Sequence, residues 1–172
     1  MAQERGQTLE QAAGTKPAAV SVCTVARGQE WWALVIRRAD DLREHAGQCG
    51  FPGGRPDAQD RSLWETARRE TFEEVGITLQ DSQCAGRLAQ VTARGSGYAI
   101  VPWLVVLGDF PSLILNRSEV SSAHWVSGRQ LSQSRQMTPA GWAYACPAGT
   151  IWGASARIVR QLEELKDRKD FI

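Results

Sequence analysis

The residues from Ser62 to Gly76 predict an amphipathic helix with a strongly acidic face. Ser62 is a suitable N-cap, and Glu65 stands where it completes a capping box. Gly76 stands where a C-cap glycine is expected. At about 100° per residue, a stripe of apolar and small side chains falls along one side of this helix, where it is suited to face a sheet. The stripe consists of Trp64, Ala67, Thr71 and Val75.

Three glutamates share the adjoining side of the same helix. With Glu70 as the reference, Glu73 falls at about −60° and Glu74 at about +40°, so the three carboxylates lie within an arc of roughly 100°. Two like charges about 4 Å apart repel by about 1 kcal/mol in water and about 4 kcal/mol near a protein surface. A hard divalent cation, Mg²⁺ or Mn²⁺, would neutralise them through oxygen ligands. The alternative is a solvated helix face, since glutamate is common on exposed surfaces.

The residues around these acids favour the cation site over the solvated face. Gly53-Gly54 precedes the helix, Arg69 directly precedes Glu70, and Gly76 follows shortly after the adjacent pair Glu73-Glu74. Arg69 can fix one of the carboxylates by a charge-assisted hydrogen bond or bind a phosphate oxygen. These features occur together at fixed spacing, and this combination is a specific signal for a cation site.

The rest of the chain predicts a single α/β domain, in which helices pack against a mixed sheet. Its 172 residues suffice for one core but not for two ordinary domains. We expect a flexible tail over residues 1–16 and one domain over residues 17–168. The predicted elements are strands at 18–26, 31–38, 88–92, 98–107 and 124–126, a polar loop at 55–61 and a second long helix at 151–166.

Charge and composition exclude several classes of partner. Twenty lysines and arginines against nineteen aspartates and glutamates leave a net charge of +1, so nothing attracts the chain in bulk to nucleic acid or to an anionic membrane. No apolar run approaches the roughly 20 residues of a membrane-spanning helix, and the N-terminus has no apolar leader, so we expect a cytoplasmic protein. The four cysteines are far apart and lack metal-binding spacing, which predicts reduced thiols.

The acidic helix and the turn before it resemble the signature of the Nudix family, in which a glycine is followed after a spacer by R-E-x-x-E-E-x-G and an apolar residue. The match runs from Arg69 to Ile77. The resemblance implies a Nudix-type α/β/α sandwich with a mixed β-sheet. It also implies a metal-dependent hydrolase that cleaves the diphosphate of a small-molecule nucleotide. Many enzymes of this fold are dimers, so the resemblance implies a possible homodimer.

A longer stretch is similar to the coenzyme A pyrophosphatase branch of that family. The branch carries a motif of the form L-L-x-x-R-S-x-x-x-R-x-x-x-G-x-x-x-F-P-G-G, which this chain follows from Leu34 to Gly54 with Ala39 in place of the usual serine. Val101-Pro102 and residues 151–157 match further pieces of the branch. This resemblance implies hydrolysis of coenzyme A or acyl-CoA to 4′-phosphopantetheine and adenosine 3′,5′-bisphosphate.

The resemblance also implies roles for individual residues. Glu73 and Glu74 would be metal ligands, and Glu70 would be either a third ligand or the base that deprotonates water. Arg69 would orient one of these acids, and Gly54 would offer its backbone carbonyl to the metal. The expected catalytic residues are therefore Arg69, Glu70 and Glu73, and the expected metal ligands are Gly54, Glu70, Glu73 and Glu74.

Residues before the glycine turn are candidates for binding substrate phosphates. Arg38, Arg43 and His45 would contact them, including the 3′-phosphate of coenzyme A. The alternatives are surface arginines at a strand edge and a histidine that caps the loop. Asp60 is expected to help hold the loop before the acidic helix. Glu119 stands before a strand, where some Nudix enzymes place an extra catalytic acid, but a structural or solvent role is favoured for it.

The tryptophans are expected to pack in or beside the sheet, although one of them, or Tyr98, could instead stack on an adenine. The four concerned are Trp31, Trp32, Trp103 and Trp125.

Two alternatives to the coenzyme A reading stay open. The substrate could be another nucleoside diphosphate derivative, such as ADP-ribose or a dinucleotide. The chain could also be a Nudix-fold sensor that binds a nucleotide without cleaving it. Such modules usually lose at least one acid, whereas Arg69, Glu70, Glu73 and Glu74 are all present here.

Overall fold

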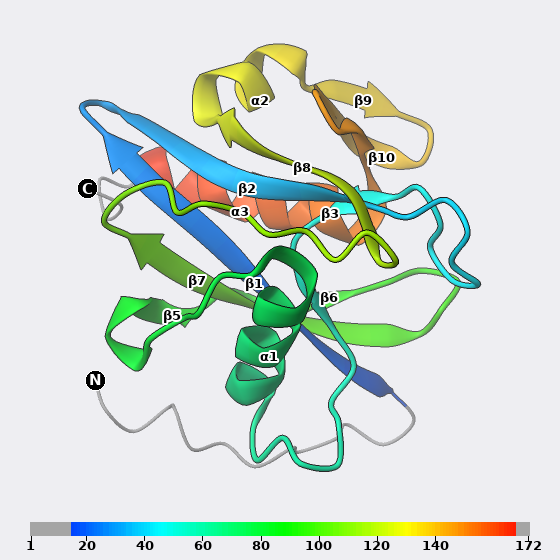
Figure 1. Ribbon diagram of the computed structural model, residues 1–172. Coiled ribbons are helices and arrows are strands. Elements are labelled where there is room, and N and C mark those ends of the chain that lie inside the picture. The colour runs from blue at the N-terminus through cyan, green and yellow to red at the C-terminus, as the bar shows by residue number, and fades with distance from the viewer. Residues whose placement is uncertain (1–14, 168–172) are drawn as a thin grey trace.

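A computed structural model describes residues 15–167, and Figure 1 shows a mixed sheet with helices on both of its faces. Its centre is a long antiparallel hairpin of β1 and β2. β7 runs parallel to β1, and β8 pairs antiparallel with β2. The bounds of these four strands are β1 (Lys16–Arg27), β2 (Glu30–Arg38), β7 (Tyr98–Leu107) and β8 (Val120–Ser127).

Shorter strands extend this centre on both sides. β5 and β6 pair with β7, and β4 pairs with β1 next to the acidic helix. Beyond β2, the sheet continues through β3, β11, β10 and β9, which completes an 11-stranded mixed sheet. The short strands are β3 (Cys49–Gly50), β4 (Gly53–Gly54), β5 (Cys84–Arg87), β6 (Val91–Thr92), β9 (Gln136–Thr138), β10 (Gly141–Cys146) and β11 (Gly149–Ile151).

The central strands separate two cores, because successive side chains of a strand point to opposite faces. Leu34 and Ile36 of β2 pack in the core that contains the buried side of α1. Ala33 and Val35 pack in the other core, with α2 and α3. The predicted α/β/α sandwich is therefore confirmed. The helices are α1 (Leu63–Val75), α2 (Gly128–Ser134), α3 (Gly153–Asp167) and a 3₁₀ turn (Asp81–Gln83).

The ends of α1 are those that the sequence predicts. Ser62 Oγ accepts a hydrogen bond of 3.2 Å from the N–H of Glu65. Gly76 has a φ of 75°, and its N–H donates to the carbonyl of Phe72. The second half of the capping box differs, because the Glu65 carboxylate accepts from the N–H of Arg61 at 2.7 Å. The Arg61 guanidinium also binds this carboxylate, which draws it away from the Ser62 N–H.

The tail and two strands differ from the prediction in extent. Residues 1–14 of the predicted tail lie outside the described residues, and Lys16 already belongs to β1. The strand predicted at 88–92 is replaced by the two short strands β5 and β6. The strand predicted at 124–126 extends over all of β8, because β8 follows β2 along most of its length.

The C-terminal half holds elements that the sequence did not predict. The helix predicted from Ile151 begins at Gly153, because Ile151 pairs with Tyr144 of β10 and ends β11. α2 and the strands β9 to β11 are short, with three to seven residues each. Segments of this length carry too few periods of an apolar pattern to be recognised.

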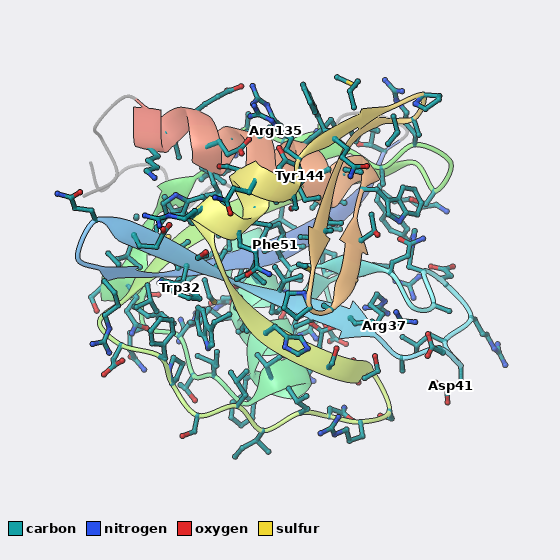
Figure 2. All side chains as sticks on the ribbon, turned by 90° about the horizontal axis from the view of Figure 1, so that it is seen from above. Trp32, Arg37, Asp41, Phe51, Arg135 and Tyr144 are labelled. Carbon is teal, nitrogen blue, oxygen red and sulfur yellow. The ribbon has the colours of Figure 1, made fainter. Side chains whose placement is uncertain are left out.

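A buried polar network ties β10 to α3. The Tyr144 hydroxyl donates to Oε2 of Glu163 at 2.9 Å, and Arg135 and Arg160 contact the same oxygen at 3.3 Å. Figure 2 shows Tyr144 and Arg135 close to α3. A buried carboxylate is stable when it is paired and hydrogen-bonded in this way. The network fixes the part of the sheet that carries Trp142.

The four tryptophans pack as predicted. Trp31 and Trp103 are buried. Trp32 and Trp125 form edge contacts with Phe110, with ring centroids 5.9 and 5.1 Å apart respectively. Among the described helices, none combines the length and the apolar character needed to cross a membrane.

Candidate active site

The glycine turn lies directly against the acidic helix. β4 pairs with β1 through Gly53 and Gly54. Gly53 has a φ of 155°, and a Cβ there would lie 2.2 Å from the carbonyl oxygen of Ala19. A Cβ on Gly54 would lie 2.5 Å from the carboxyl carbon of Glu70. The Gly53 backbone thus approaches β1 too closely for a side chain, whereas a side chain at Gly54 would displace the carboxylate of Glu70.

Glu74 is held in this turn by two fixed contacts. Its side chain is 1% exposed, and Oε2 accepts a hydrogen bond of 2.9 Å from the N–H of Gly53. Nη1 of Arg38 lies 3.3 Å from Oε1. Burial raises the pKa of Glu74 to about 8, although the Gly53 N–H and the Arg38 charge oppose that rise. The residue is thus a desolvated carboxyl in a defined orientation.

Glu70 and Glu119 complete an acidic cluster with Glu74. The candidate ligand oxygens of the three residues lie within 4.8 Å of one another. Burial raises the pKa of Glu70, with smaller additions from the neighbouring acids, while Arg69 opposes the rise. We call Glu70, Glu74 and Glu119 the acidic triplet.

The sequence-based expectation favoured a structural or solvent role for Glu119; the structure places its carboxylate beside Glu70 and Glu74, and its role stays a prediction. The segment before β8 folds across the end of α1: the N–H of Ile114 donates to the carbonyl of Val75 at 2.9 Å, and that of Asn116 donates to the carbonyl of Glu74 at 3.0 Å. These contacts bring Glu119 to a helix more than forty positions earlier in the sequence. The position of Glu119 before a predicted strand was the available signal.

Arg69 organises the remaining charges around the cluster. Its Nε and Nη2 bind both carboxylate oxygens of Asp60, and Nη2 also donates to the carbonyl of Arg55 at 3.0 Å. Burial alone would raise the pKa of Asp60, but the bonds from Arg69 and the Asp57 N–H outweigh it and lower that pKa. Asp60 thus holds the loop before α1 through Arg69, as expected.

Glu73 lies beside the acidic triplet on its exposed side. Nη1 of Arg69 donates to Oε1 of Glu70 and to Oε2 of Glu73, both at 2.9 Å. The two carboxylates are therefore within reach of one guanidinium nitrogen. The Glu73 side chain is 46% exposed, whereas that of Glu70 is 15% exposed. The structure thus brings Arg69, Glu70, Glu73 and Glu74 together with Gly54, and their predicted roles stay predictions.

A large open cavity of about 1420 Å³ begins at the acidic triplet. Arg38, Arg43 and His45 all line it, so the three predicted phosphate-binding residues share one space with the acids. Arg43 and His45 are exposed. His45 has a φ of 58°, and its Nδ1 lies 3.1 Å from Oε1 of Gln48, so it also shapes the loop. In Figure 2, Arg37 and Asp41 mark the end of β2 from which this loop leaves.

Aromatic residues on the cavity wall differ from those considered in the sequence. Tyr98 lines the cavity, but Trp31, Trp32, Trp103 and Trp125 do not. Trp142 and Trp152 line it instead, and Trp152 is 51% exposed. Sequence reasoning missed both because β10, β11 and the start of α3 were not recognised as one wall.

The acidic triplet fits a hard divalent cation. Its donors are carboxylate oxygens from two separate segments, and Glu74 is buried with the Arg38 guanidinium 3.3 Å away. Buried like charges repel strongly, and a divalent cation with oxygen ligands relieves that repulsion. Glu70, Glu74 and Glu119 would hold such a cation. Gly54 and Glu73 lie beside these three acids.

Comparison with known proteins identifies the family. The NUDIX domain model matches residues 15–151. The chain is 35% identical over 145 residues to an "Uncharacterized Nudix hydrolase NudL" of Photorhabdus laumondii, covering 76% of this chain and 75% of that protein. It is 33% identical over 165 residues to the protein of the same name from Yersinia enterocolitica, covering 88% of this chain and 82% of that one.

A solved structure with a similar fold is the NUDIX domain of Shewanella oneidensis NrtR complexed with ADP ribose. The TM-score is 0.64 at 16% sequence identity, and the match covers 87% of each chain. A likeness at this identity supports the fold alone. The acidic helix, the glycine turn and most of the sheet fall inside the matched NUDIX range, so the chain belongs to the Nudix hydrolase family, the pyrophosphohydrolases of nucleoside diphosphate derivatives.

Proposed function

We propose that this chain is a Mg²⁺- or Mn²⁺-dependent hydrolase of coenzyme A or acyl-CoA. It would release 4′-phosphopantetheine and adenosine 3′,5′-bisphosphate. The observation that carries the proposal is the shared cavity, in which the acidic triplet and the basic residues Arg38 and Arg43 face one space. The coenzyme A-type motif from Leu34 to Gly54 supplies both of these arginines and the glycine turn.

The proposed ligands are the acidic triplet together with Glu73 and the carbonyl of Gly54. When bound, the cation would neutralise charge on the diphosphate and assist the attack of water. The 2.9 Å bond between Gly53 N–H and Glu74 orients that carboxylate before anything binds. Arg69 does the same for Glu70 and Glu73 through Nη1.

Glu70 is the proposed proton acceptor. Its Oε1 accepts a hydrogen bond from Nη1 of Arg69, and we assign the proton transfer to the carboxylate oxygen that does not hold the cation. Burial raises its pKa, and a base whose pKa lies closer to the working pH transfers protons more effectively. The water oxygen then bonds to one phosphorus, and the bridging P–O bond breaks to release two phosphate products.

The basic residues would bind the phosphates that do not react. Coenzyme A carries a 3′-phosphate in addition to its diphosphate, so its recognition needs positive charge at more than one place. Arg38 lies beside Glu74, whereas Arg43 and His45 lie on the exposed loop after β2. This separation supports binding of the diphosphate near Arg38 and of the 3′-phosphate near Arg43.

Incubation with coenzyme A, 3′-dephospho-CoA, ADP-ribose and a diadenosine polyphosphate tests the proposal. Products are separated by chromatography after incubation with Mg²⁺, Mn²⁺ or EDTA. We expect coenzyme A to be cleaved with either metal and to stay intact in EDTA. Cleavage of ADP-ribose with coenzyme A left intact would assign another substrate. Tight nucleotide binding without product would indicate a sensor.

The Arg43→Ala variant tests the 3′-phosphate assignment. The expected result is a KM for coenzyme A raised several-fold, with little change for 3′-dephospho-CoA. Arg129→Ala is the matched control, because Arg129 is 77% exposed, pairs with Glu30 and does not line the cavity. Equal effects of Arg43→Ala on both substrates would contradict the assignment.

A further inference from the structure

The segment before β8 is fastened to the end of α1. Ile114 and Leu115 pass the C-cap of α1. The next residue, Asn116, donates its N–H to the carbonyl of Glu74 at 3.0 Å. A Cβ on Gly76 would lie 2.9 Å from Cβ of Ile114, so the C-cap glycine also makes room for this segment. The backbone of Asn116 is thereby fixed relative to a member of the acidic triplet.

The side chain of Asn116 connects this fixed point to Glu119. Its Oδ1 accepts hydrogen bonds from the N–H of Ser118 at 3.2 Å and from Oγ of Ser118 at 2.6 Å. These two donors set the orientation of the amide, so that its NH₂ group points away from Ser118. Nδ2 donates to Oε1 of Glu119 at 3.0 Å.

We propose that Asn116 is a positioning residue that holds Glu119 in the acidic triplet. Asn116 binds α1 at Glu74 through its backbone and binds Glu119 through its amide, so it joins two members of the triplet that come from separate segments. It does not line the cavity. The inference rests on the proposed role of the triplet as a cation site.

The energetic reason lies in the repulsion within the triplet. An unrestrained Glu119 carboxylate would turn toward solvent, away from Glu70 and Glu74, since like charges at these distances repel. A neutral amide donor stabilises the carboxylate in place without adding a charge that competes with a cation. Partners of metal ligands act in this way, and their loss typically weakens metal binding by about 10- to 100-fold.

Mn²⁺ affinity in the absence of substrate distinguishes this role from that of an ordinary turn residue. We expect Asn116→Ala to weaken Mn²⁺ binding about 10-fold by titration calorimetry or electron paramagnetic resonance. Ser118→Ala is the matched control, because it removes one bond to Oδ1 but leaves the amide donor to Glu119 in place. Its loss of Mn²⁺ affinity should be smaller than that of Asn116→Ala, because the N–H of Ser118 still holds the amide.

A double-mutant cycle with Glu119→Gln shows whether Asn116 acts through Glu119. Glu119→Gln should weaken Mn²⁺ binding, and the double variant should bind no more weakly than Glu119→Gln alone. Fully additive effects, or an unchanged affinity in Asn116→Ala, would overturn the inference about Asn116 alone. An unchanged affinity in Glu119→Gln would instead remove Glu119 from the proposed cation site, and the inference with it.

Thermal unfolding in EDTA monitors the fold of each variant. If Asn116→Ala does not fold, Asn116→Ser replaces it, since a serine hydroxyl can still accept from the N–H two residues later in the turn but is too short to reach Glu119. The same loss of Mn²⁺ affinity is expected, and an affinity equal to that of the unmodified protein would overturn the proposal.

Discussion

The N–H of Gly53 donates a 2.9 Å hydrogen bond to Oε2 of Glu74. This contact joins the two halves of the sequence signature, the glycine turn and the acidic helix, across 21 positions. It also explains how a carboxyl that is 1% exposed stays in one orientation. A group oriented before its ligand arrives loses little conformational entropy on binding.

Gly54→Ala should reduce activity without unfolding the protein. The new Cβ would lie 2.5 Å from the Glu70 carboxyl carbon, so Glu70 must move away from the turn. We expect kcat to fall at least about 10-fold, as for other changes that displace a catalytic group. Gly108→Ala is the control, because a Cβ there meets nothing within 4 Å. Similar kinetics of the two variants would contradict the assigned position of Glu70.

Asp60→Asn should destabilise the fold in a pH-dependent way. Asp60 is 5% exposed at its side chain and binds Arg69, and hydrogen bonds to a charged group are worth about 1.5–3 kcal/mol. Its pKa is lowered in the folded state, so this stabilisation is fully present above the unfolded pKa of about 3.9 and is lost as the pH falls through the folded pKa.

Urea unfolding at several pH values checks that prediction. The free energy of unfolding of Asp60→Asn should lie about 1.5–3 kcal/mol below that of the unmodified protein at pH 7. This difference should shrink below about pH 3.9. Asp40→Asn serves as the control, since Asp40 is 71% exposed in its pair with Arg37. A difference that does not change with pH would mean that the charge of Asp60 is not the stabilising feature.

Arg38→Ala should affect metal and substrate in opposite directions. Nη1 of Arg38 lies 3.3 Å from Glu74, and its buried Nε has no hydrogen-bond partner among the described residues. A guanidinium at this place repels a cation at Glu74 but attracts a diphosphate. We expect Mn²⁺ to bind several-fold more tightly to the variant and the KM for coenzyme A to rise several-fold. Weaker Mn²⁺ binding would show that Arg38 supports the cation site.

The sequence was sufficient to predict α1, the glycine turn and the central strands, because each of them carries a local signal. Ser62 and Gly76 are end signals of a helix, and Gly53-Gly54 follows from the spacing of the family signature. These features depend on neighbouring residues alone.

Features that depend on distant contacts were not predictable in the same way. Glu119 joins the acidic triplet because Ile114 and Asn116 bind the end of α1, and no local pattern announces those bonds. Ile151 fits a helical apolar spacing but pairs with Tyr144 instead, so tertiary pairing overrides the local preference. Short strands with few residues give no periodic signal.

The Glu74→Gln variant tests the central claim, that buried carboxylates beside the glycine turn hold a divalent cation for diphosphate hydrolysis. Mn²⁺ affinity, coenzyme A turnover and thermal unfolding in EDTA are measured on the same preparation. Glu164→Gln is the control, since Glu164 is 57% exposed on α3. We predict that Glu74→Gln loses Mn²⁺ binding and reduces kcat by more than about 100-fold, with unfolding near that of the unmodified protein. Mn²⁺ affinity and turnover equal to those of the control would contradict the account.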